Sequence, residues 1–318
     1  MDMKTAVKAI SILSLAALAG CMTSRNKPAP DTLIAHRGES VDAPENTLPA
    51  YKLAVERGFG FECDLYLSKD GRVFTFHDRT LTRTTGGANT NRCADVTWKD
   101  TLSKIDVGNW GKWNGSKFAG TPPALLEDVL ALARDGRQIY LEIKAGPEIV
   151  PVIKAILAAQ NRATPRNVLF IAFNKEVCKA IKELIPEYTV YWLVTASVGR
   201  GAEKRPITAD EVIAGIRESK ADGVDMLFDP DVVDEAFVAA VKKEGFGFHV
   251  WTVDELPLAL RAFAVGVETV TTNRAKGIYD EYAMLYAPEP DTRDEFSDRE
   301  IDGAAFPTPV LHDTGVSR

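Results

Sequence analysis

The stretch QIYLEIKAGPEIVPVIKAILAAQNRATPRNVLFIA, residues 138–172, contains one strand, one helix and a second strand in succession. Its two ends, residues 138–143 and 168–172, are short apolar runs rich in β-branched and aromatic residues, which is typical of buried strands. Between them, residues 147–159 place apolar side chains at helical spacing. A strand, a helix and a further strand of this kind form the repeating unit of a parallel sheet.

The same alternation continues on both sides of this stretch. Strands are predicted at eight places: Leu33–Ala35, Phe59–Leu65, Gln138–Ile143, Val168–Ala172, Thr189–Val194, Gly223–Phe228, Gly247–Trp251 and Thr269–Thr272. A short additional run, Val73–Phe76, follows the second strand after the turn Lys69-Asp70-Gly71. Helices are predicted after Asn46-Thr47, where either residue can cap, and near residues 124–134, 147–159, 175–185, 209–219, 231–244, 255–265 and 275–284.

Eight β/α units in 318 residues predict an α/β protein whose fold is a TIM (β/α)8 barrel. The alternative is an open, doubly wound sheet, but no G-x-G-x-x-G follows the first strand. Residues 79–122 interrupt the alternation and are predicted to form a small insertion after the second barrel strand. The barrel is assigned to residues 32–286, and residues 287–318 to an acidic, mostly irregular tail.

The first residues have the layout of a secretory signal peptide, because Lys4 and Lys8 precede an apolar run over residues 9–19. Leu18-Ala19-Gly20-Cys21 resembles the bacterial lipobox, in which the cysteine is lipidated and becomes the new N-terminus. We therefore predict a lipoprotein signal peptide over residues 1–20, a lipid anchor at Cys21 and a polar tether over residues 21–31. Met22 is not the aspartate that would indicate inner-membrane retention, so the predicted location is the bacterial cell envelope, at the outer membrane facing the periplasm. The alternative is an ordinary signal peptide.

The composition, 45% hydrophobic and 26% charged, is ordinary for a soluble globular protein. Asp and Glu number 45 against 38 Lys and Arg, and the net charge of -7 argues against a general nucleic-acid partner. Beyond Cys21 the cysteines are Cys63, Cys93 and Cys178, an odd number without the spacing of a zinc site. An oxidising compartment would allow one disulfide, but the sequence selects no pair and indicates no oligomeric state.

Polar residues recur where the predicted strands end, which is where barrel enzymes place their active sites. Alternate residues on a strand share a face, so Glu62 and Asp64 point the same way, as do Glu142 and Lys144 on the next barrel strand. Inward-facing carboxylates are costly unless they are paired or bind a metal. Three of them on adjacent strands predict a site for one divalent cation, Ca²⁺ or Mg²⁺. The alternative is a set of salt bridges with Lys144 or Arg37.

The chain has four histidines, His36, His77, His249 and His312. His36 and His77 end strands beside the carboxylates, so they are the candidates for a general acid and a general base. His249 lies on a strand two residues before Trp251 and could reach the same site, whereas His312 lies in the predicted tail.

An ordered series of motifs runs through the chain. HRG at 36–38 and PENT at 44–47 are followed by E-x-D at 62–64, HDxxLxRTT at 77–85, LEIK at 141–144 and WTV at 251–253. This series resembles the glycerophosphodiester phosphodiesterase family over about residues 32–284. The resemblance implies a TIM barrel with an insertion after the second barrel strand, and this is where the irregular residues 79–122 fall.

The resemblance also implies roles for seven of these residues. The implied metal ligands are Glu62, Asp64 and Glu142, the implied acid–base pair is His36 and His77, and the implied phosphate contacts are Arg37 and Lys144. The chain departs from the family at three places. One is Pro123-Ala124-Leu125-Leu126-Glu127-Asp128, where the family usually has a PTL-E-E pattern. Asp254 follows WTV where the family often has asparagine, and Asn273 follows the last strand where the family often has aspartate.

Three further residues have two readings each. Trp251 would line the substrate pocket, with core packing as the alternative. Phe173 at the end of the fourth strand has the same two readings, and for this residue core packing is the expectation. Asn46 would orient the metal ligands or cap the following helix.

The activity implied by the resemblance is metal-dependent hydrolysis of small glycerophosphodiesters to glycerol 3-phosphate and an alcohol. We assign His36 to the glycerol side and His77 to the leaving alcohol, with either water or the glycerol 2-hydroxyl as nucleophile. One alternative is a phospholipase D-like hydrolase of lysolipids, which the anchor would place near its substrates. The other is a non-catalytic surface lipoprotein or adhesin, and the intact set of carboxylates and histidines argues against it.

Overall fold

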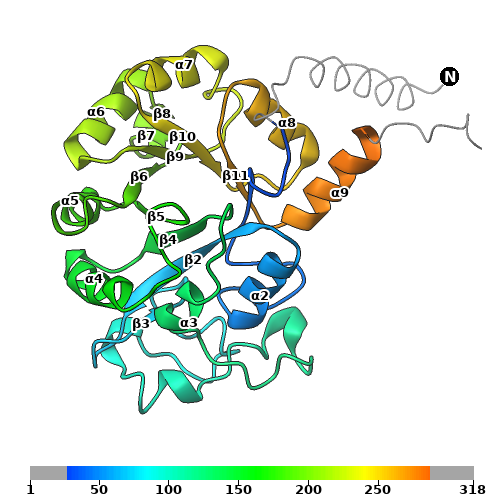
Figure 1. Cartoon of the computed structure of the whole chain (residues 1–318), viewed down its shortest axis with the longest axis vertical. Coiled ribbons are helices and arrows are strands. Elements are labelled where there is room, and N and C mark those ends of the chain that lie inside the picture. Colours follow the sequence, from blue (N-terminus) through cyan, green and yellow to red (C-terminus); the bar gives the residue numbers. More distant parts are fainter. Residues whose placement is uncertain (1–26, 287–318) are drawn as a thin grey trace, which may run out of the picture.

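The structure, a computed structural model, describes residues 27–286 of the chain. Eight parallel strands close into a barrel, because β1 pairs with β2 on one side and with β11 on the other (Figure 1). The barrel strands are β1 (Leu33–Ala35), β2 (Gly60–Leu67), β4 (Ile139–Ile143), β5 (Val168–Ala172), β6 (Thr189–Val194), β9 (Gly223–Leu227), β10 (Gly247–Trp251) and β11 (Val270–Thr272). The predicted TIM barrel is therefore confirmed, and the open sheet is wrong.

Helices lie around the outside of this barrel (Figure 1). They are α2 (Leu48–Glu56), α3 (Leu126–Leu130), α4 (Val150–Ala158), α5 (Lys175–Leu184), α6 (Ala209–Ser219), α7 (Glu235–Lys243), α8 (Leu256–Ala264) and α9 (Ala275–Tyr286). The main core fills the space between strands and helices, since the outward side chains of each strand join one apolar cluster with the inner faces of the helices. The inward side chains then remain available for a site inside the barrel.

The second barrel strand continues into a hairpin. β3 (Val73–Thr75) pairs antiparallel with β2, with Leu65 opposite Thr75. Residues 79–122 follow and form three short 3₁₀ turns, Cys93–Asp95, Leu102–Lys104 and Gly111–Trp113. This segment has an apolar cluster of its own, with Phe74, Leu81, Cys93 and Leu102 at its centre. It lies beyond β3 and α3 at one end of the molecule (Figure 1).

Some element boundaries differ from the prediction. The helix expected near 124–134 is only the five-residue α3, because Leu125 offers no side-chain cap and Gly136 has a positive φ of 70°. The helix expected near 231–244 begins at Glu235, where the Asp234 carboxylate accepts from the Phe237 amide at 2.8 Å. A small hairpin, β7 (Ser197–Val198) with β8 (Arg205–Pro206), was not predicted.

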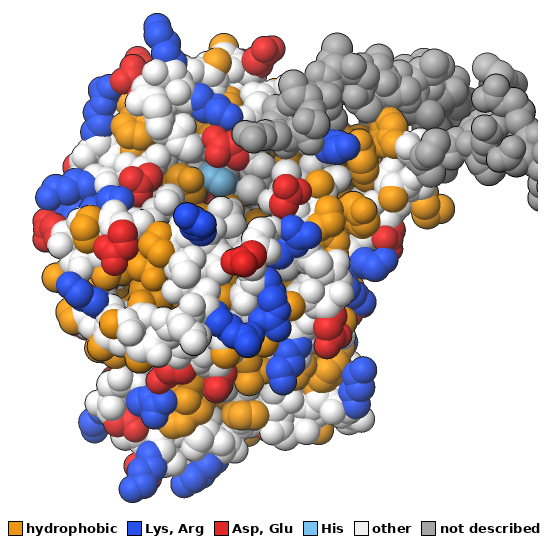
Figure 2. Space-filling model, in the orientation of Figure 1, with side chains coloured by type: hydrophobic (Ala, Val, Ile, Leu, Met, Phe, Trp, Pro, Cys, Tyr) orange, Lys and Arg blue, Asp and Glu red, His pale blue; other side chains and the backbone are white. Residues whose placement is uncertain are grey.

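Cys63, Cys93 and Cys178 are buried free thiols, so the disulfide that the sequence allowed is not formed among them. Within residues 27–286, no helix combines the length and apolar character needed to cross a membrane. The predicted signal peptide, Cys21, most of the tether and the predicted tail with His312 lie outside the described residues. On the face shown in Figure 2 a histidine is visible among acidic and basic side chains, and hydrophobic side chains gather over α9.

Candidate active site

The loop after β1 has an unusual backbone that brings two side chains over the strand ends. Arg37 and Gly38 both have positive φ, 58° and 79°. A Cβ on Gly38 would lie 2.7 Å from the Ala50 backbone, so the close approach of α2 requires glycine here. The turn aims the Arg37 amide at Glu62, whose Oε2 accepts from it at 2.9 Å.

Three buried carboxylates lie beside this loop. Glu62 and Asp64 come from β2 and Glu142 from β4, and strand register places Asp64 opposite Glu142. One oxygen of each lies within 4.8 Å of the others. Among the described residues, no group hydrogen-bonds to Glu62 Oε1, although this atom is buried. A set of oxygen donors with an unsatisfied buried oxygen fits a hard divalent cation.

The carboxylates strongly affect one another's ionisation. Burial and the Asp64 charge raise the pKa of Glu62, and the same two causes raise the pKa of Glu142 to about 7. Burial also acts to raise the pKa of Asp64, but the Lys144 ammonium and the Arg37 guanidinium lower it to about 2. Without an added cation, this cluster therefore concentrates like charges in a buried place.

Two basic side chains face the carboxylates. Lys144 Nζ lies 2.6 Å from Glu142 Oε1 and 3.1 Å from Asp64 Oδ1. Arg37 Nε lies 3.5 Å from Asp64 Oδ2, while its Nη1 donates to Glu45 at 2.9 Å. Both predicted alternatives for the carboxylates thus coexist, because the salt bridges with Lys144 and Arg37 are present and still leave oxygens for a cation.

His36 is held in one tautomer. Its Nδ1 donates to Asn273 Oδ1 at 2.7 Å, which leaves Nε2 without a proton, 3.9 Å from Glu62 Oε2. Burial, followed by the positive charge of Arg37, lowers the pKa of His36 to about 4. His36 is therefore a neutral imidazole near pH 7, ready to accept a proton at Nε2.

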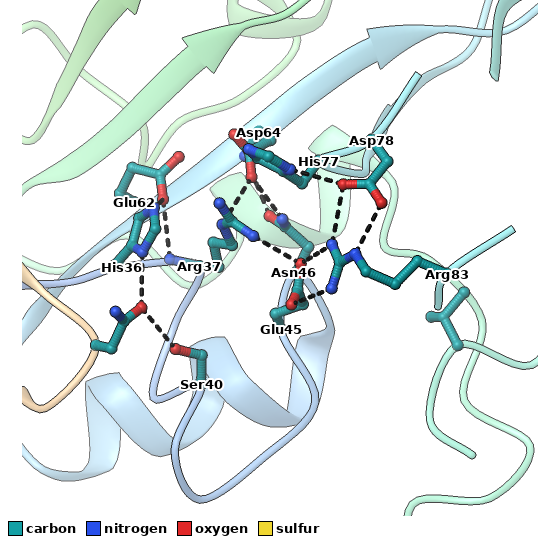
Figure 3. Close-up of polar contacts among 12 residues, drawn as sticks. His36, Arg37, Ser40, Glu45, Asn46, Glu62, Asp64, His77, Asp78 and Arg83 are labelled. Atoms are coloured by element: carbon teal, nitrogen blue, oxygen red, sulfur yellow. Dashed lines mark hydrogen bonds and ion pairs between the residues drawn. The ribbon is translucent and has the colours of Figure 1, made fainter. Parts of the chain in front are cut away.

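His77 is held by a carboxylate instead of an amide. Its Nδ1 donates to Asp78 Oδ1 at 2.8 Å, and Arg83 Nε donates to Asp78 Oδ2 at 2.7 Å. Arg83 also donates to both oxygens of Glu45, so one chain of contacts joins His77 to the loop that carries Arg37 (Figure 3). A carboxylate behind a histidine can stabilise the positive charge that a general acid carries.

Asn46 holds the Asp64 carboxylate in place and does not cap α2. Its Nδ2 donates to Asp64 Oδ2 at 2.6 Å, and its Oδ1 accepts from the Asp64 amide at 3.1 Å and from the Tyr51 hydroxyl at 2.8 Å. The cap is Thr47, whose Oγ1 accepts from the Ala50 amide. Asn46 therefore orients Asp64, while its neighbour Thr47 caps the helix.

A pocket of about 280 Å³ lies at the ends of the strands, and the polar side chains that line it include those of His36, Arg37, Glu62, His77, Glu142 and Lys144. Trp251 lines it, as predicted, and donates through Nε1 to the Asp225 carbonyl at 3.1 Å. Phe173 was expected in the core but is 47% exposed and also lines the pocket, with its ring edge-to-face against Trp251. The expectation for Phe173 was wrong because the chain turns outward after β5 and leaves that ring at the pocket rim.

His249 is not among the residues that line the pocket. Its ring is buried lower in the barrel, where Nδ1 contacts the Tyr140 hydroxyl at 2.9 Å and the Thr269 hydroxyl. Its Nε2 has no hydrogen-bond partner among the described residues and lies 3.7 Å from Glu268 Oε2.

Several residues that contact the site were not predicted from the sequence. Glu45, Asp78 and Arg83 stand inside the PENT and HDxxLxRTT motifs, so their charges were a signal that could have been used. Asn273 lies 237 positions from His36, and no local pattern predicts that contact. Asp225 was not predicted either, although a charged residue in the middle of an apolar strand is itself a signal.

The fold and the geometry of the site together have the architecture of a barrel enzyme, because two histidines, two cationic side chains and three clustered carboxylates lie together at the C-terminal strand ends. Comparison with known families agrees with this class. The model of the Glycerophosphoryl diester phosphodiesterase family matches residues 36–276, which is more than half of the chain.

Individual relatives point the same way. A glycerophosphodiester phosphodiesterase of Caldanaerobacter subterraneus subsp. tengcongensis is 30% identical over 76% of this chain and 93% of that protein. One from Bacillus subtilis is 27% identical over 85% of this chain and 95% of that protein. The chain therefore belongs to the glycerophosphoryl diester phosphodiesterase family, and it is an enzyme of that class.

Solved structures share the fold at lower sequence identity. An Oleispira antarctica phosphodiesterase in complex with its product sn-glycerol-3-phosphate superposes with a TM-score of 0.66, 23% identity, and coverage of 83% of this chain and 98% of that one. A glycerophosphoryl diester phosphodiesterase-like structure from Silicibacter pomeroyi superposes with a TM-score of 0.67, 19% identity, and coverage of 81% and 97%.

Proposed function

We propose that the protein hydrolyses glycerophosphodiesters to glycerol 3-phosphate and an alcohol, with one divalent cation, Ca²⁺ or Mg²⁺, as cofactor. The observation that carries the proposal is the pair of histidines beside the carboxylate cluster, each with Nδ1 held by a fixed acceptor. The activity of the relatives and the product in the Oleispira antarctica complex support the same substrate class.

Glu62, Asp64 and Glu142 would hold the cation, since their buried oxygens converge and are not all satisfied by protein groups. A bound divalent cation would stabilise negative charge on the phosphodiester oxygens. Arg37 and Lys144 line the same pocket and would bind the remaining oxygens by charge-assisted hydrogen bonds.

The two histidines divide the proton transfers. His36 is neutral and has a free Nε2, so it would take the proton of the nucleophile. His77, with Asp78 behind it, would give a proton to the leaving alcohol oxygen. The phosphorus–oxygen bond to the alcohol then breaks as the new bond to the nucleophile forms.

The nucleophile is either water or the 2-hydroxyl of the glycerol, and the two routes differ in one product. Internal attack gains from proximity and passes through a cyclic glycerol phosphate, which water then opens. Phosphorus NMR during turnover separates the routes, because only internal attack shows the cyclic ester before glycerol 3-phosphate.

The direct test uses purified residues 22–318 with glycerophosphocholine, glycerophosphoethanolamine, glycerophosphoglycerol, glycerophosphoinositol and a lysolipid. We expect glycerol 3-phosphate to be released, EDTA to stop the release, and Ca²⁺ or Mg²⁺ to restore it. No release from any glycerophosphodiester with either ion present would refute the proposal. Turnover of the lysolipid alone would favour a phospholipase D-like activity.

We also propose that the mature protein is attached to the bacterial outer membrane by a lipid on Cys21 and faces the periplasm. The support is in the sequence, where a positive start and an apolar run precede Leu18-Ala19-Gly20-Cys21. Detergent phase partitioning of cells that express wild type or Cys21→Ser tests it. Wild type should enter the detergent phase and the variant should not; equal partitioning of both would contradict the anchor.

A further inference from the structure

The pocket has two chemically different halves. Residues on or after β1, β2, β3 and β4 supply one half, which contains the two histidines, the carboxylates and the basic side chains of Arg37 and Lys144. The neighbouring strands β5, β6, β9 and β10 and the residues directly after them supply the other half, which is mainly apolar and aromatic: Ile171, Phe173, Leu193, Asp225, Trp251 and Thr252. Thr271 of β11 also lines the pocket. Asp225 is the one ionisable side chain that this second half contributes to the pocket lining.

Asp225 is a carboxylate without a partner. It is 0% exposed, and among residues 27–286 neither of its carboxylate oxygens has a hydrogen-bond partner. Burial, and then the like charge of Glu142, raise the pKa of Asp225 well above its usual range, so a positive group beside it would favour its ionised form. Arg37 and Lys144 cannot compensate it, since they are engaged with the other carboxylates. Burying such a group costs stability unless a ligand satisfies it.

Two aromatic rings line the same pocket as Asp225. Trp251 is fixed over β9, because its Nε1 donates to the Asp225 carbonyl at 3.1 Å. Phe173 meets Trp251 with ring centroids 5.7 Å apart and planes at 85°, so the rings form two walls of a corner. Aromatic walls are an arrangement that attracts quaternary ammonium groups, and Asp225 in the same pocket can add its negative charge when ionised.

We propose that this aromatic corner, formed by Phe173 and Trp251 with Asp225 beneath, is a headgroup subsite that selects a cationic headgroup such as choline. The inference rests on the proposed function, which places the phosphodiester on the charged half of the pocket. A trimethylammonium group has no N–H to donate, so its attraction to Asp225 acts through space and does not require contact with the buried oxygens.

Other headgroups fit this half less well. An apolar chain would match Ile171 and Leu193 but would leave Asp225 uncompensated. A neutral polyol needs several hydrogen-bond partners, and the second half offers mainly apolar and aromatic surface. Only a positive, weakly hydrated group satisfies both the aromatic walls and the carboxylate.

The test compares kcat/KM for glycerophosphocholine and for glycerophosphoglycerol, whose headgroup is neutral. Wild type should prefer the choline ester, and Asp225→Asn should lower the ratio of the two values about tenfold, as expected for a loss of charge assistance at a cation–aromatic site. Asp222→Asn is the matched control, because Asp222 precedes β9 outside the pocket and pairs with Lys182. It should leave the ratio unchanged.

Calorimetric titration gives a second readout that does not need turnover. Choline should bind more tightly than 3,3-dimethylbutan-1-ol, its uncharged analogue of the same shape, and Asp225→Asn should reduce the difference, with the aromatic walls keeping the remainder. The variant should fold, since removing an unpaired buried carboxylate removes a destabilising charge.

Equal affinity of wild type for choline and its neutral analogue would overturn the subsite. So would an equal loss of kcat/KM for both esters in Asp225→Asn, which would place this residue against the glycerol that they share. If wild type hydrolysed no diester at all, the proposed function would fail, and the titration would still decide whether the corner binds a cation.

Discussion

The His36 imidazole and the Asn273 amide share a hydrogen bond of 2.7 Å between Nδ1 and Oδ1. The orientation of the amide is itself fixed by Asp254, which accepts from Asn273 Nδ2 at 2.7 Å and from the Asn273 backbone amide at 2.8 Å. Asn273 Oδ1 must therefore face His36, and His36 must carry its proton on Nδ1. Asp254 thus sets the tautomer of a histidine that it does not touch.

Exchanging the two residues should change the pH dependence of the reaction. In the double variant Asp254→Asn with Asn273→Asp, the pair can still hydrogen-bond, but a carboxylate now faces His36 Nδ1. That charge stabilises the imidazolium and raises the pKa of His36 above its present value of about 4. Because the base must be unprotonated, the acid limb of kcat/KM should move to higher pH, by about one unit or more.

A pH profile from 4 to 8 measures this shift, with Asp254→Asn alone as the control. Both oxygens of Asp254 accept N–H groups of Asn273, and an asparagine can accept with only one of them. The single variant should lose kcat without moving the acid limb. An unchanged profile in the double variant would show that His36 is not the base that titrates.

Asn46 and Thr47 should have separable effects although they are neighbours. Asn46→Ala removes two hydrogen bonds to Asp64, so we expect divalent-cation affinity to fall by roughly 10- to 100-fold, as for other groups that orient metal ligands. Thr47→Ala removes the cap of α2 and should lower the free energy of unfolding by about 1 kcal/mol with little change in cation affinity. Calorimetry and denaturant unfolding measure the two quantities. Equal cation affinity in both variants would contradict the role given to Asn46.

The contact between Asp78 and His77 should matter for kcat more than for KM. Asp78→Asn replaces the carboxylate that would stabilise a positively charged His77 with a neutral amide. We expect kcat to fall on the order of 10²-fold, the usual contribution of one general acid. Arg83→Lys serves as a milder comparison, since a lysine can reach one of Asp78 or Glu45 but cannot bridge both. A loss confined to KM in Asp78→Asn would argue for substrate binding instead.

Much of this site could be predicted from sequence because it depends on strand geometry. The period of two places Glu62 and Asp64 on one face, and parallel pairing of β2 with β4 brings Glu142 beside them. The strand boundaries follow from apolar runs, so the barrel was also predictable. Helix ends were less so, because they depend on caps such as Asp234 that compete with other nearby polar residues.

What could not be predicted depends on loops and on distant contacts. Phe173 is apolar and follows a buried strand, and only the path of the next loop decides that its ring is exposed. The contact of His36 with Asn273 requires closure of the barrel between β1 and β11. Asn273 also carries no motif of its own, so its role emerges only when the two strands are side by side.

Binding of the divalent cation should raise the free energy of unfolding, and this rise can be measured without any turnover. Glu62, Asp64 and Glu142 repel one another in the free protein, and a ligand that binds only the folded state stabilises it by mass action. At a concentration 100 times its Kd, Ca²⁺ or Mg²⁺ should add about 2.7 kcal/mol to the free energy of unfolding. Scanning calorimetry with and without EDTA should therefore show a higher Tm with the ion present. The matched variant is Glu142→Gln, which removes one charged candidate ligand: with the ion it should show a smaller rise in Tm than wild type. The same rise in the variant as in wild type would place the ion away from Glu142.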